Sequence, residues 1–174
     1  MAIENQPDNL NVLSPVSFRL VIEKFPETTF WCQSANIPGV SVSEGTINTP
    51  YRDIPTIGDK MEFETLDITM IVDEDLSNFN EIMKWMRGST PVDDRKNYTE
   101  YLNTRRTQDL MTDYQNYLSD ATLHVLSNSK NINKSVIFYD IFPSSLGALS
   151  FDSAGDVTPL TTDISFQIRD YIIE

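Results

Sequence analysis

The sequence predicts a mainly β fold, a β-sandwich or barrel of about eight strands with one amphipathic α-helix packed on it and a partly helical insertion. Short segments of alternating apolar and polar residues follow one another, with Pro, Gly or Asn turn signals between them. Only one stretch, residues 73–88, has a clear helical period. The length of 174 residues suits one domain with a sizeable core. We therefore expect residues 1–174 to form a single domain.

The first strands are expected to form a hairpin. Residues 1–14 are polar and are expected to be a flexible arm. The alternation that follows predicts a strand with one buried face, formed by Val16, Phe18, Leu20 and Ile22. A turn at Pro26 leads to a partner strand over residues 29–35, and a turn at Pro38-Gly39 leads to another strand over residues 40–47.

Residues 48–60 are predicted to be a long connection, because they hold two Pro residues and one Gly. The segment also carries three apolar side chains, Tyr51, Ile54 and Ile57. Apolar residues on a loop of this length indicate that it packs on something, and long loops inside compact domains are often functional. The residues alone leave open whether the loop packs on its own domain or on another molecule.

Residues 62–73 are the clearest predicted strand, and their apolar positions share one face: Leu66, Ile68, Met70 and Val72. Met61 and Phe63 have the opposite parity. Either a bulge therefore lies near Thr65, or the two ends of the strand bury different faces.

One helix is predicted after this strand. The acidic run over residues 73–75 supplies a capping side chain and favours the positive end of the helix dipole. Apolar residues recur at intervals of three and four, which predicts a core stripe of Phe79, Ile82, Met83 and Met86. Gly88 is placed to end the helix. Residues 88–120 are expected to be an exposed insertion with partial helix, and further strands are predicted over residues 121–126, 135–142, 148–151 and 163–173.

The residue types disfavour an enzyme and a metal site. His124 is the only histidine and Cys32 the only cysteine, which is too few for a zinc site and leaves a catalytic triad without recognisable partners. An EF-hand loop that starts at Asp73 would need Gly and Glu where the chain has Asn78 and Lys84. We therefore expect no catalytic residue, no metal and no cofactor.

The charge is strongly acidic, with 26 Asp and Glu against 13 Lys and Arg and a net charge of -13. This balance argues against a protein that grips nucleic acid through its phosphates, since such binding needs clustered Lys and Arg. It leaves room for a protein past which nucleic acid slides. No apolar run approaches the ~20 residues that span a bilayer, and the N-terminus does not resemble a signal peptide. We therefore expect no membrane association, and the single cysteine fits a reducing cytoplasm.

Four segments, in this order, resemble the tail tube proteins of contractile-tailed phages. The first is the opening pair of strands, which ends at Pro38. The second is Gly58-Asp59 followed by a long strand that ends in acidic residues. The third is the helix with Phe79 and Trp85, and the fourth runs from Phe142-Pro143 through Gly147 to an apolar-x-aromatic-Asp strand. Together they cover most of the chain.

The resemblance implies a structural protein whose subunits form hexameric rings, with strands joined into one continuous barrel and rings stacked into a tube. By position, residues 48–60 would be the inter-ring loop, with contacts from Tyr51, Arg52, Asp53, Ile54 and Ile57. The expected lumen residues lie opposite the buried faces of the long strands and are Glu62, Glu64, Asp67, Thr69, Ser165, Gln167 and Arg169. Carboxylates there would repel phosphates and let DNA pass.

The implied partners are further copies of the chain and the tail sheath and baseplate proteins, with DNA passing through without specific binding. The implied location is the virion tail, assembled in the host cytoplasm, and the helix is expected on the outer side, facing a sheath. Residues 88–120 differ from those of typical tube proteins and leave open a tube-initiating or baseplate component of the same fold. The second alternative is a host-surface binding β-sandwich module that uses Tyr98, Tyr101, Tyr114 and Tyr117.

Overall fold

The structure, a computed structural model, describes residues 12–89, 117–153 and 158–174. Most of the expected N-terminal arm and of the expected insertion, with Tyr98, Tyr101 and Tyr114, therefore lies outside the described residues. The elements are β1 (Phe18–Ile22), α1 (Thr28–Trp31), β2 (Cys32–Ala35), β3 (Val40–Asn48), β4 (Asp53–Phe63), β5 (Leu66–Ile71), α2 (Ser77–Ser89), β6 (Ser119–Leu126), β7 (Ile132–Leu146), β8 (Thr161–Gln167) and β9 (Asp170–Ile173). The expectation of a mainly β fold with one substantial helix is confirmed.

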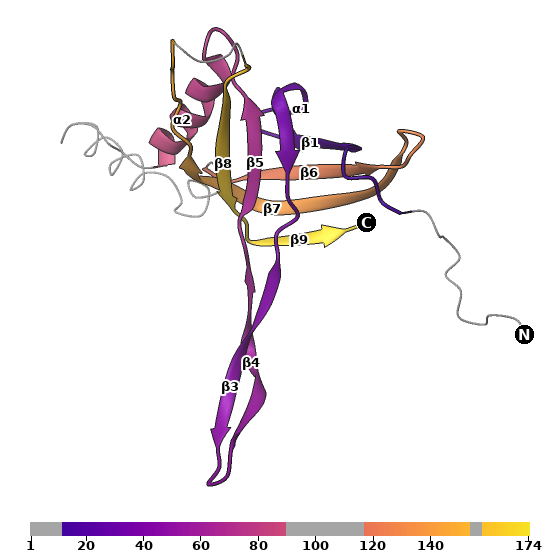
Figure 1. The fold of residues 1–174 in the computed structure, drawn as a ribbon, viewed down its shortest axis with the longest axis vertical. Coiled ribbons are helices and arrows are strands. Elements are labelled where there is room, and N and C mark those ends of the chain that lie inside the picture. The colour runs from indigo at the N-terminus through magenta and orange to yellow at the C-terminus, as the bar shows by residue number, and fades with distance from the viewer. Residues whose placement is uncertain (1–11, 90–116, 154–157) are drawn as a thin grey trace, which may run out of the picture.

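The described strands form one seven-stranded antiparallel sheet and a separate two-stranded hairpin. The large sheet consists of two half-sheets that share β7. Half-sheet A contains β1, β6, the first part of β7, and β9. Half-sheet B contains the last part of β7, then β8, β5 and β2. The strands of the two half-sheets cross steeply, as in orthogonal sheet packing (Figure 1).

The core lies between the two half-sheets and is built from the alternation that the sequence indicates. Along β5, β8 and the first part of β6, every second residue is buried, and the residues between them are half-buried or exposed. The buried apolar side chains are Leu20, Ile22, Phe25, Leu66, Ile68, Met70, Ile82, Ala121, Leu123, Val136, Phe138, Ile141, Ile164 and Phe166. Burial of these side chains is the main stabilising term of the fold.

One face of α2 packs against this core. Ile82 is buried, and Met86 and Trp85 pack against the core, where the Trp85 ring lies 5.9 Å from that of Phe166. Phe79 and Met83 are half-buried, so the packed stripe is turned away from them toward Trp85. At the start of the helix, Asp73 Oδ1 accepts a hydrogen bond from the Asn78 backbone N–H at 3.2 Å, and Asn78 Oδ1 accepts one from the Phe79 N–H at 2.8 Å.

Residues 48–60 are not a long loop, and that prediction is wrong. β4 begins at Asp53, and only residues 49–52 connect it to β3. Pro55 is tolerated because both strands of a two-stranded hairpin are edge strands. Gly58 is a strand residue that allows a close approach, since a Cβ there would lie 2.3 Å from Ser43 Oγ. Pro and Gly are typical of turns and therefore predicted a loop here. The segment forms a strand instead, because it pairs with β3.

Three further strand predictions need correction. The predicted strand over residues 62–73 is interrupted at Glu64–Thr65, with β4 before the break and β5 after it. The expected strand over residues 29–35 begins only at Cys32, because α1 precedes it, and it pairs with β5 rather than forming a hairpin with β1. No strand forms over residues 148–151. Short apolar segments do not by themselves distinguish a strand from a helical turn.

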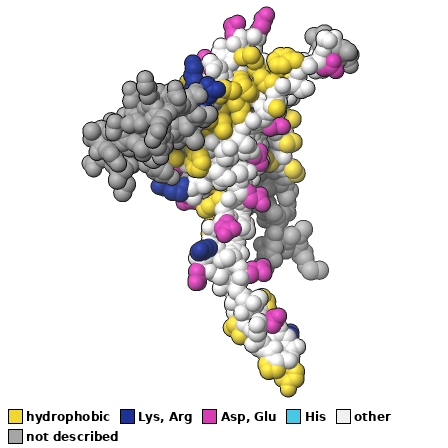
Figure 2. Space-filling model, turned by 90° about the vertical axis from the view of Figure 1, so that its left-hand side faces the viewer, with side chains coloured by type: hydrophobic (Ala, Val, Ile, Leu, Met, Phe, Trp, Pro, Cys, Tyr) yellow, Lys and Arg dark blue, Asp and Glu magenta, His cyan; other side chains and the backbone are white. Residues whose placement is uncertain are grey.

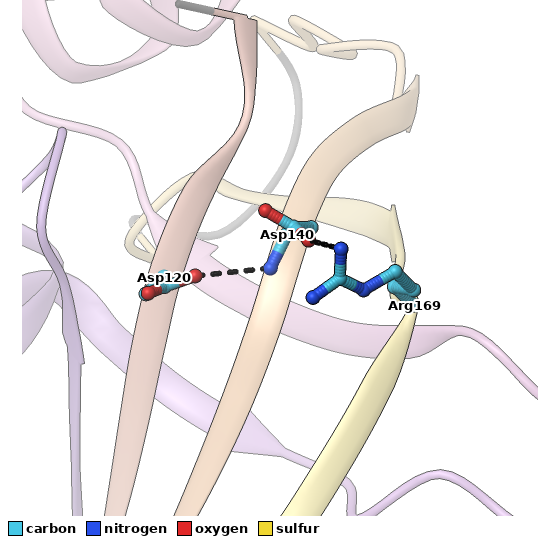
Figure 3. Close-up of polar contacts among 3 residues, drawn as sticks. All are labelled: Asp120, Asp140 and Arg169. Atoms are coloured by element: carbon cyan, nitrogen blue, oxygen red, sulfur yellow. Dashed lines mark hydrogen bonds and ion pairs between the residues drawn. The ribbon is translucent and has the colours of Figure 1, made fainter. Parts of the chain in front are cut away.

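β7 changes from half-sheet A to half-sheet B at a sharp corner. Asp140 has a φ of 52°, in the left-handed region, and it follows the last residue that pairs with β9. Its backbone N–H donates a hydrogen bond to Asp120 Oδ1 at 3.0 Å, and its Oδ2 lies 2.5 Å from Nη1 of Arg169 (Figure 3). Asp is among the few residues that adopt this conformation readily. The three side chains therefore hold the bend that lets one strand serve both half-sheets.

We expect Asp140→Ala to unfold at a lower urea concentration than Asp140→Gly. Both variants lose the contact with Arg169, but only Ala is strained at a φ of 52°, so the difference in the free energy of unfolding should be about 1 kcal/mol. Asp140→Asn, which tolerates the same conformation, is the matched control. Equal midpoints for the Ala and Gly variants would show that the backbone conformation at this corner is not under strain.

Candidate functional site

The outward face of half-sheet B is polar and slightly hollow. Alternation on β5 brings Asp67 and Thr69 to this face, and alternation on β8 brings Asp163 and Ser165. The register pairs Asp67 with Ser165 and Thr69 with Asp163. These four residues line a shallow hollow together with Ser34, Ala35, Asn36 and Ile68. Among the described residues, no Lys or Arg lines the hollow and two Asp residues do, so the local charge is negative.

Hydrogen bonds organise this polar face. Thr69 Oγ1 donates to Asp163 Oδ1 at 2.8 Å, which links β5 to β8. The Asp67 backbone N–H donates to Asn36 Oδ1 at 2.7 Å, and Asn36 Nδ2 donates to the Thr65 carbonyl at 3.2 Å. Within the described part of the chain, the Asp67 and Asp163 side chains form no ion pair, and both residues are exposed. The face therefore presents fixed carboxylates to the surrounding water.

Four of the expected lumen residues come together on this face, namely Asp67, Thr69, Ser165 and Gln167. Glu62 and Glu64 lie beside it, at the base of the hairpin, where alternation sets them opposite Phe63. Phe63 contacts Tyr171, which packs against Phe138 of the core, so the two glutamates point away from the core side.

Arg169 does not join this set. It lies in the connection between β8 and β9, and its guanidinium pairs with Asp140 at the corner. Asp163 and Ser34 also line the hollow, although the sequence did not lead us to predict them there. Asp163 could have been found, because it precedes Ser165 by two residues in the same alternation. Ser34 could not, since its place depends on the pairing of β2 with β5.

Half-sheet B has two unpaired edges among the described residues. β2 forms one edge and pairs only with β5. The last part of β7 forms the other edge, because β6 pairs with β7 no further than Ile141. Free edges expose backbone N–H and C=O groups that can pair with another strand. Half-sheet B can therefore be extended on both sides by strands of other molecules.

The hairpin of β3 and β4 projects from the body as a continuation of β2 and β5 (Figure 1). β3 has nine residues, which corresponds to a length of about 30 Å. Its base is fixed to the body, because the Phe63 and Tyr171 rings are 5.6 Å apart and the Tyr171 hydroxyl donates to the Pro38 carbonyl at 3.2 Å. The outer part touches nothing else among the described residues.

The projecting hairpin carries exposed apolar side chains on both faces. Ile47 pairs with Ile54 on one face, and Ile57, 89% exposed, pairs with Glu44 on the other. Tyr51 at the tip is 98% exposed. Figure 2 shows hydrophobic side chains gathered at the free end of the hairpin, below a stretch that carries acidic ones. A lone two-stranded hairpin is marginally stable in water, so these side chains call for a partner surface.

The five residues expected to make inter-ring contacts all lie in this outer part. Tyr51 and Arg52 belong to the tip, where Thr49 Oγ1 accepts a hydrogen bond from the Arg52 N–H at 3.3 Å. Asp53, Ile54 and Ile57 belong to β4 rather than to a loop.

Groups suited to catalysis do not converge in the described part of the chain. His124 Nδ1 lies 2.9 Å from Ser135 Oγ on the surface of half-sheet A, and no carboxylate of the described residues pairs with the His124 ring. In residues 12–89, 117–153 and 158–174, no three or more His, Cys, Asp or Glu side chains are grouped to hold a metal. Among the same residues, no helix is long and apolar enough to cross a membrane.

A comparison with protein-family models identifies one family. The family model described as "Phage tail tube protein" matches residues 16–174. No curated protein gives a significant sequence match.

Solved structures share the fold at low sequence identity. A chain of the sheath-tube complex of the extracellular contractile injection system PVC, in its extended state, aligns with a TM-score of 0.60 and 12% identity, over 95% of this chain and 93% of that one. A chain of the anti-feeding prophage baseplate, 6-fold symmetrised, aligns with a TM-score of 0.61 and 9% identity, over 95% and 97%. A chain of the anti-feeding prophage tube terminating cap aligns with a TM-score of 0.56 and 13% identity, over 100% and 99%.

We expect the Cys32 thiol on β2 to react slowly with iodoacetamide. Burial raises its pKa to about 11, and a backbone hydrogen bond at Ser34 lowers the pKa by a smaller amount. At pH 8 the thiolate fraction should be about 100-fold below that of the urea-unfolded chain. The folded protein should also lose stability as the pH rises between about 9 and 11, where only the unfolded thiol ionises. A labelling rate that levels off near pH 9 in the folded protein would contradict this.

Proposed function

Because the chain belongs to the phage tail tube protein family, whose model matches residues 16–174, we propose that its copies form hexameric rings that stack into the tube of a contractile tail. DNA passes through the channel of this tube without specific binding. Proteins of this family are structural components of the virion tail and are not enzymes. The observation that carries the proposal is half-sheet B, a four-stranded sheet with a free edge on each side and an acidic outer face.

Edge pairing closes the ring in this proposal. β2 of one copy pairs with the last part of β7 of the next, so that no edge of half-sheet B stays open. Six copies of half-sheet B would form a barrel of about 24 strands, and barrels of 16–18 strands already enclose an aqueous channel. The contact is heterologous, because it joins two different edges of the chain. Repeating it around a rotation axis gives a closed ring.

The polar face of half-sheet B lines the channel in this proposal. Asp67 and Asp163 would then repeat in every copy, with Thr69 and Ser165 between them. Repeated carboxylates repel the phosphates of DNA, while hydroxyls keep the wall wetted. Glu62 and Glu64 would extend the acidic lining along the base of the hairpin.

The hairpin makes the contact between rings. It continues the direction of β2 and β5 beyond the body, so it reaches along the axis of a barrel built from half-sheet B (Figure 1). Its exposed apolar residues, among them Tyr51, Ile54 and Ile57, would be covered by the adjacent ring. Burying such side chains contributes about 25 cal/mol per Å² of apolar surface.

Sheath and baseplate proteins are the remaining partners in this proposal. The solved structures with this fold come from a sheath-tube complex, a baseplate and a tube cap. α2 lies on the other side of the core from the acidic face of half-sheet B, which fits an outer position facing a sheath. A tube-initiating component would use the same surfaces, with stacking limited to one side.

The purified protein should form hollow rings or tubes by negative-stain electron microscopy as its concentration is raised. Replacing residues 47–54 by a two-residue Asn-Gly turn, which keeps the Thr46–Pro55 pair beside the turn, should leave rings but abolish tubes, because the apolar tip is lost. Shortening the β6–β7 turn at residues 128–130, on the body, is the control and should leave tubes intact. Persistent monomers, even on added baseplates, would contradict the proposed function.

Positive charges placed on the proposed channel face should make the tube bind the DNA that it encloses. We expect tubes carrying Asp67→Lys and Asp163→Lys, assembled with short DNA duplexes, to hold at least tenfold more DNA at low salt, since added cations bind phosphates in a salt-dependent way. Glu23→Lys with Glu81→Lys has the same net charge, but both residues lie away from the acidic face. Equal retention by the two pairs would show that half-sheet B does not face the channel.

A further inference from the structure

Exposed apolar side chains lie at both ends of half-sheet B. α1 lies immediately before β2 at one end, and the hairpin leaves the opposite end (Figure 1). Phe30 on α1 is 86% exposed. We propose that Phe30 of one copy inserts into an apolar corner at the base of the hairpin of a copy in the adjacent ring. This inference rests on the proposed stacking and names the two surfaces that meet.

The apolar corner is formed where the hairpin leaves the body beside β9. Val42 and Met61 are paired across the hairpin on its core side and are 48% and 61% exposed. Val40 pairs with Phe63 on the same side, and Ile173 at the end of β9 is 57% exposed. The contact between Phe63 and Tyr171 joins the hairpin to half-sheet A and closes the corner from behind. The corner therefore offers partly exposed apolar side chains on two adjoining walls.

Phe30 is held on a rigid support. Thr28 and Phe25, on either side of the turn into α1, are buried, and Thr28 Oγ1 donates to the Phe25 carbonyl at 2.8 Å. Thr29 Oγ1 donates to the Leu20 carbonyl at 3.1 Å, which ties the turn to β1. A large aromatic side chain that projects from a fixed backbone loses little entropy on binding, which is typical of interface anchors.

The occupant of the corner is another copy of the chain because stacking repeats one heterologous contact. In a stack, one end of each copy faces the opposite end of the next, so an exposed apolar group at one end requires a matching surface at the other. Tyr51 lies on the hairpin itself, and Phe151 lies on the connection after β7. Phe30 is the strongly exposed aromatic residue that stands on a helix at the end facing away from the hairpin.

Cross-linking along the stack tests the pairing. In a Cys32→Ser background, Phe30→Cys with Met61→Cys is assembled at a protein concentration well above that needed by the unmodified chain, because the Phe30 ring is lost. The tubes are then treated with a short bismaleimide. Each copy carries both thiols, so contacts between rings should give a ladder of covalent oligomers that extends beyond six copies. Phe30→Cys with Ile132→Cys is the control, because Ile132 is 61% exposed but lies at the β6–β7 turn. This control should give at least tenfold less cross-linked product.

Other outcomes overturn the inference in distinguishable ways. Tubes without a Phe30–Met61 ladder would leave the proposed function standing and remove this contact. A ladder from Phe30→Cys with Phe142→Cys that stops at the ring size would place Phe30 between neighbours of one ring, since Phe142 lies on the free edge of half-sheet B. No tubes of the unmodified chain on any nucleus would remove both proposals.

A substitution gives an independent readout of the same contact. Phe30→Ser should raise the protein concentration needed for tube formation at least tenfold while rings persist, because the apolar corner would be left open to water. Phe30→Met, which keeps an apolar side chain of adaptable shape, should restore most of the assembly. Tube formation by Phe30→Ser at the unmodified concentration would show that Phe30 does not contribute to stacking.

Discussion

The bend of β7 at Asp140 is the constraint on which the two-sided architecture depends. One strand pairs with β6 and β9 before the bend and with β8 after it. A straight β7 would leave the two half-sheets in one plane, and no core could form between them. Asp120 of β6, through the Asp140 N–H, and Arg169 of the β8–β9 connection, through the Asp140 carboxylate, hold the bend (Figure 3). The angle between the half-sheets therefore follows from a few polar contacts at one residue.

Because of this corner, the residues that form the core and the residues proposed to face the channel lie on opposite faces of half-sheet B. The inward faces of both half-sheets are apolar and form the core, so the outer face of half-sheet B is free to be acidic. Thr69 and Asp163 satisfy one another across β5 and β8 and need no cation from the same molecule. A monomer with open edges, an acidic sheet face and an apolar projecting hairpin has unsatisfied surfaces that repetition of the same chain can cover.

The hairpin of β3 and β4 has a base that packs on the body and an outer part that is proposed to contact another copy. Its base is packed by the Phe63–Tyr171 contact, while its outer part has exposed Ile and Tyr side chains. Gly58, which faces Ser43 closely, and the register shift beside it let the hairpin bend without losing its pairing. In the proposed tube, a neighbouring copy would bury most of the outer hairpin, which by itself is a marginally stable two-stranded element.

The sequence by itself determined which residues face the core and which face water. Alternation is a local property of a strand, so Leu66, Ile68 and Met70 could be assigned to the core, and Asp67 and Thr69 to one polar face, without knowing their partners. The single substantial helix was likewise predicted from its spacing, although its packed stripe turned out to include Trp85. The family resemblance followed from the order of four such segments.

Tertiary structure alone decided the pairing. Residues 53–60 form a strand because β3 lies beside them, although Pro55 and Gly58 are turn residues. The register between β5 and β8 places Asp163 beside Thr69 on the acidic face. Arg169 is not on this face, because it pairs with Asp140 at the corner. Such outcomes depend on contacts between residues far apart in the chain, whose register and geometry no local period encodes.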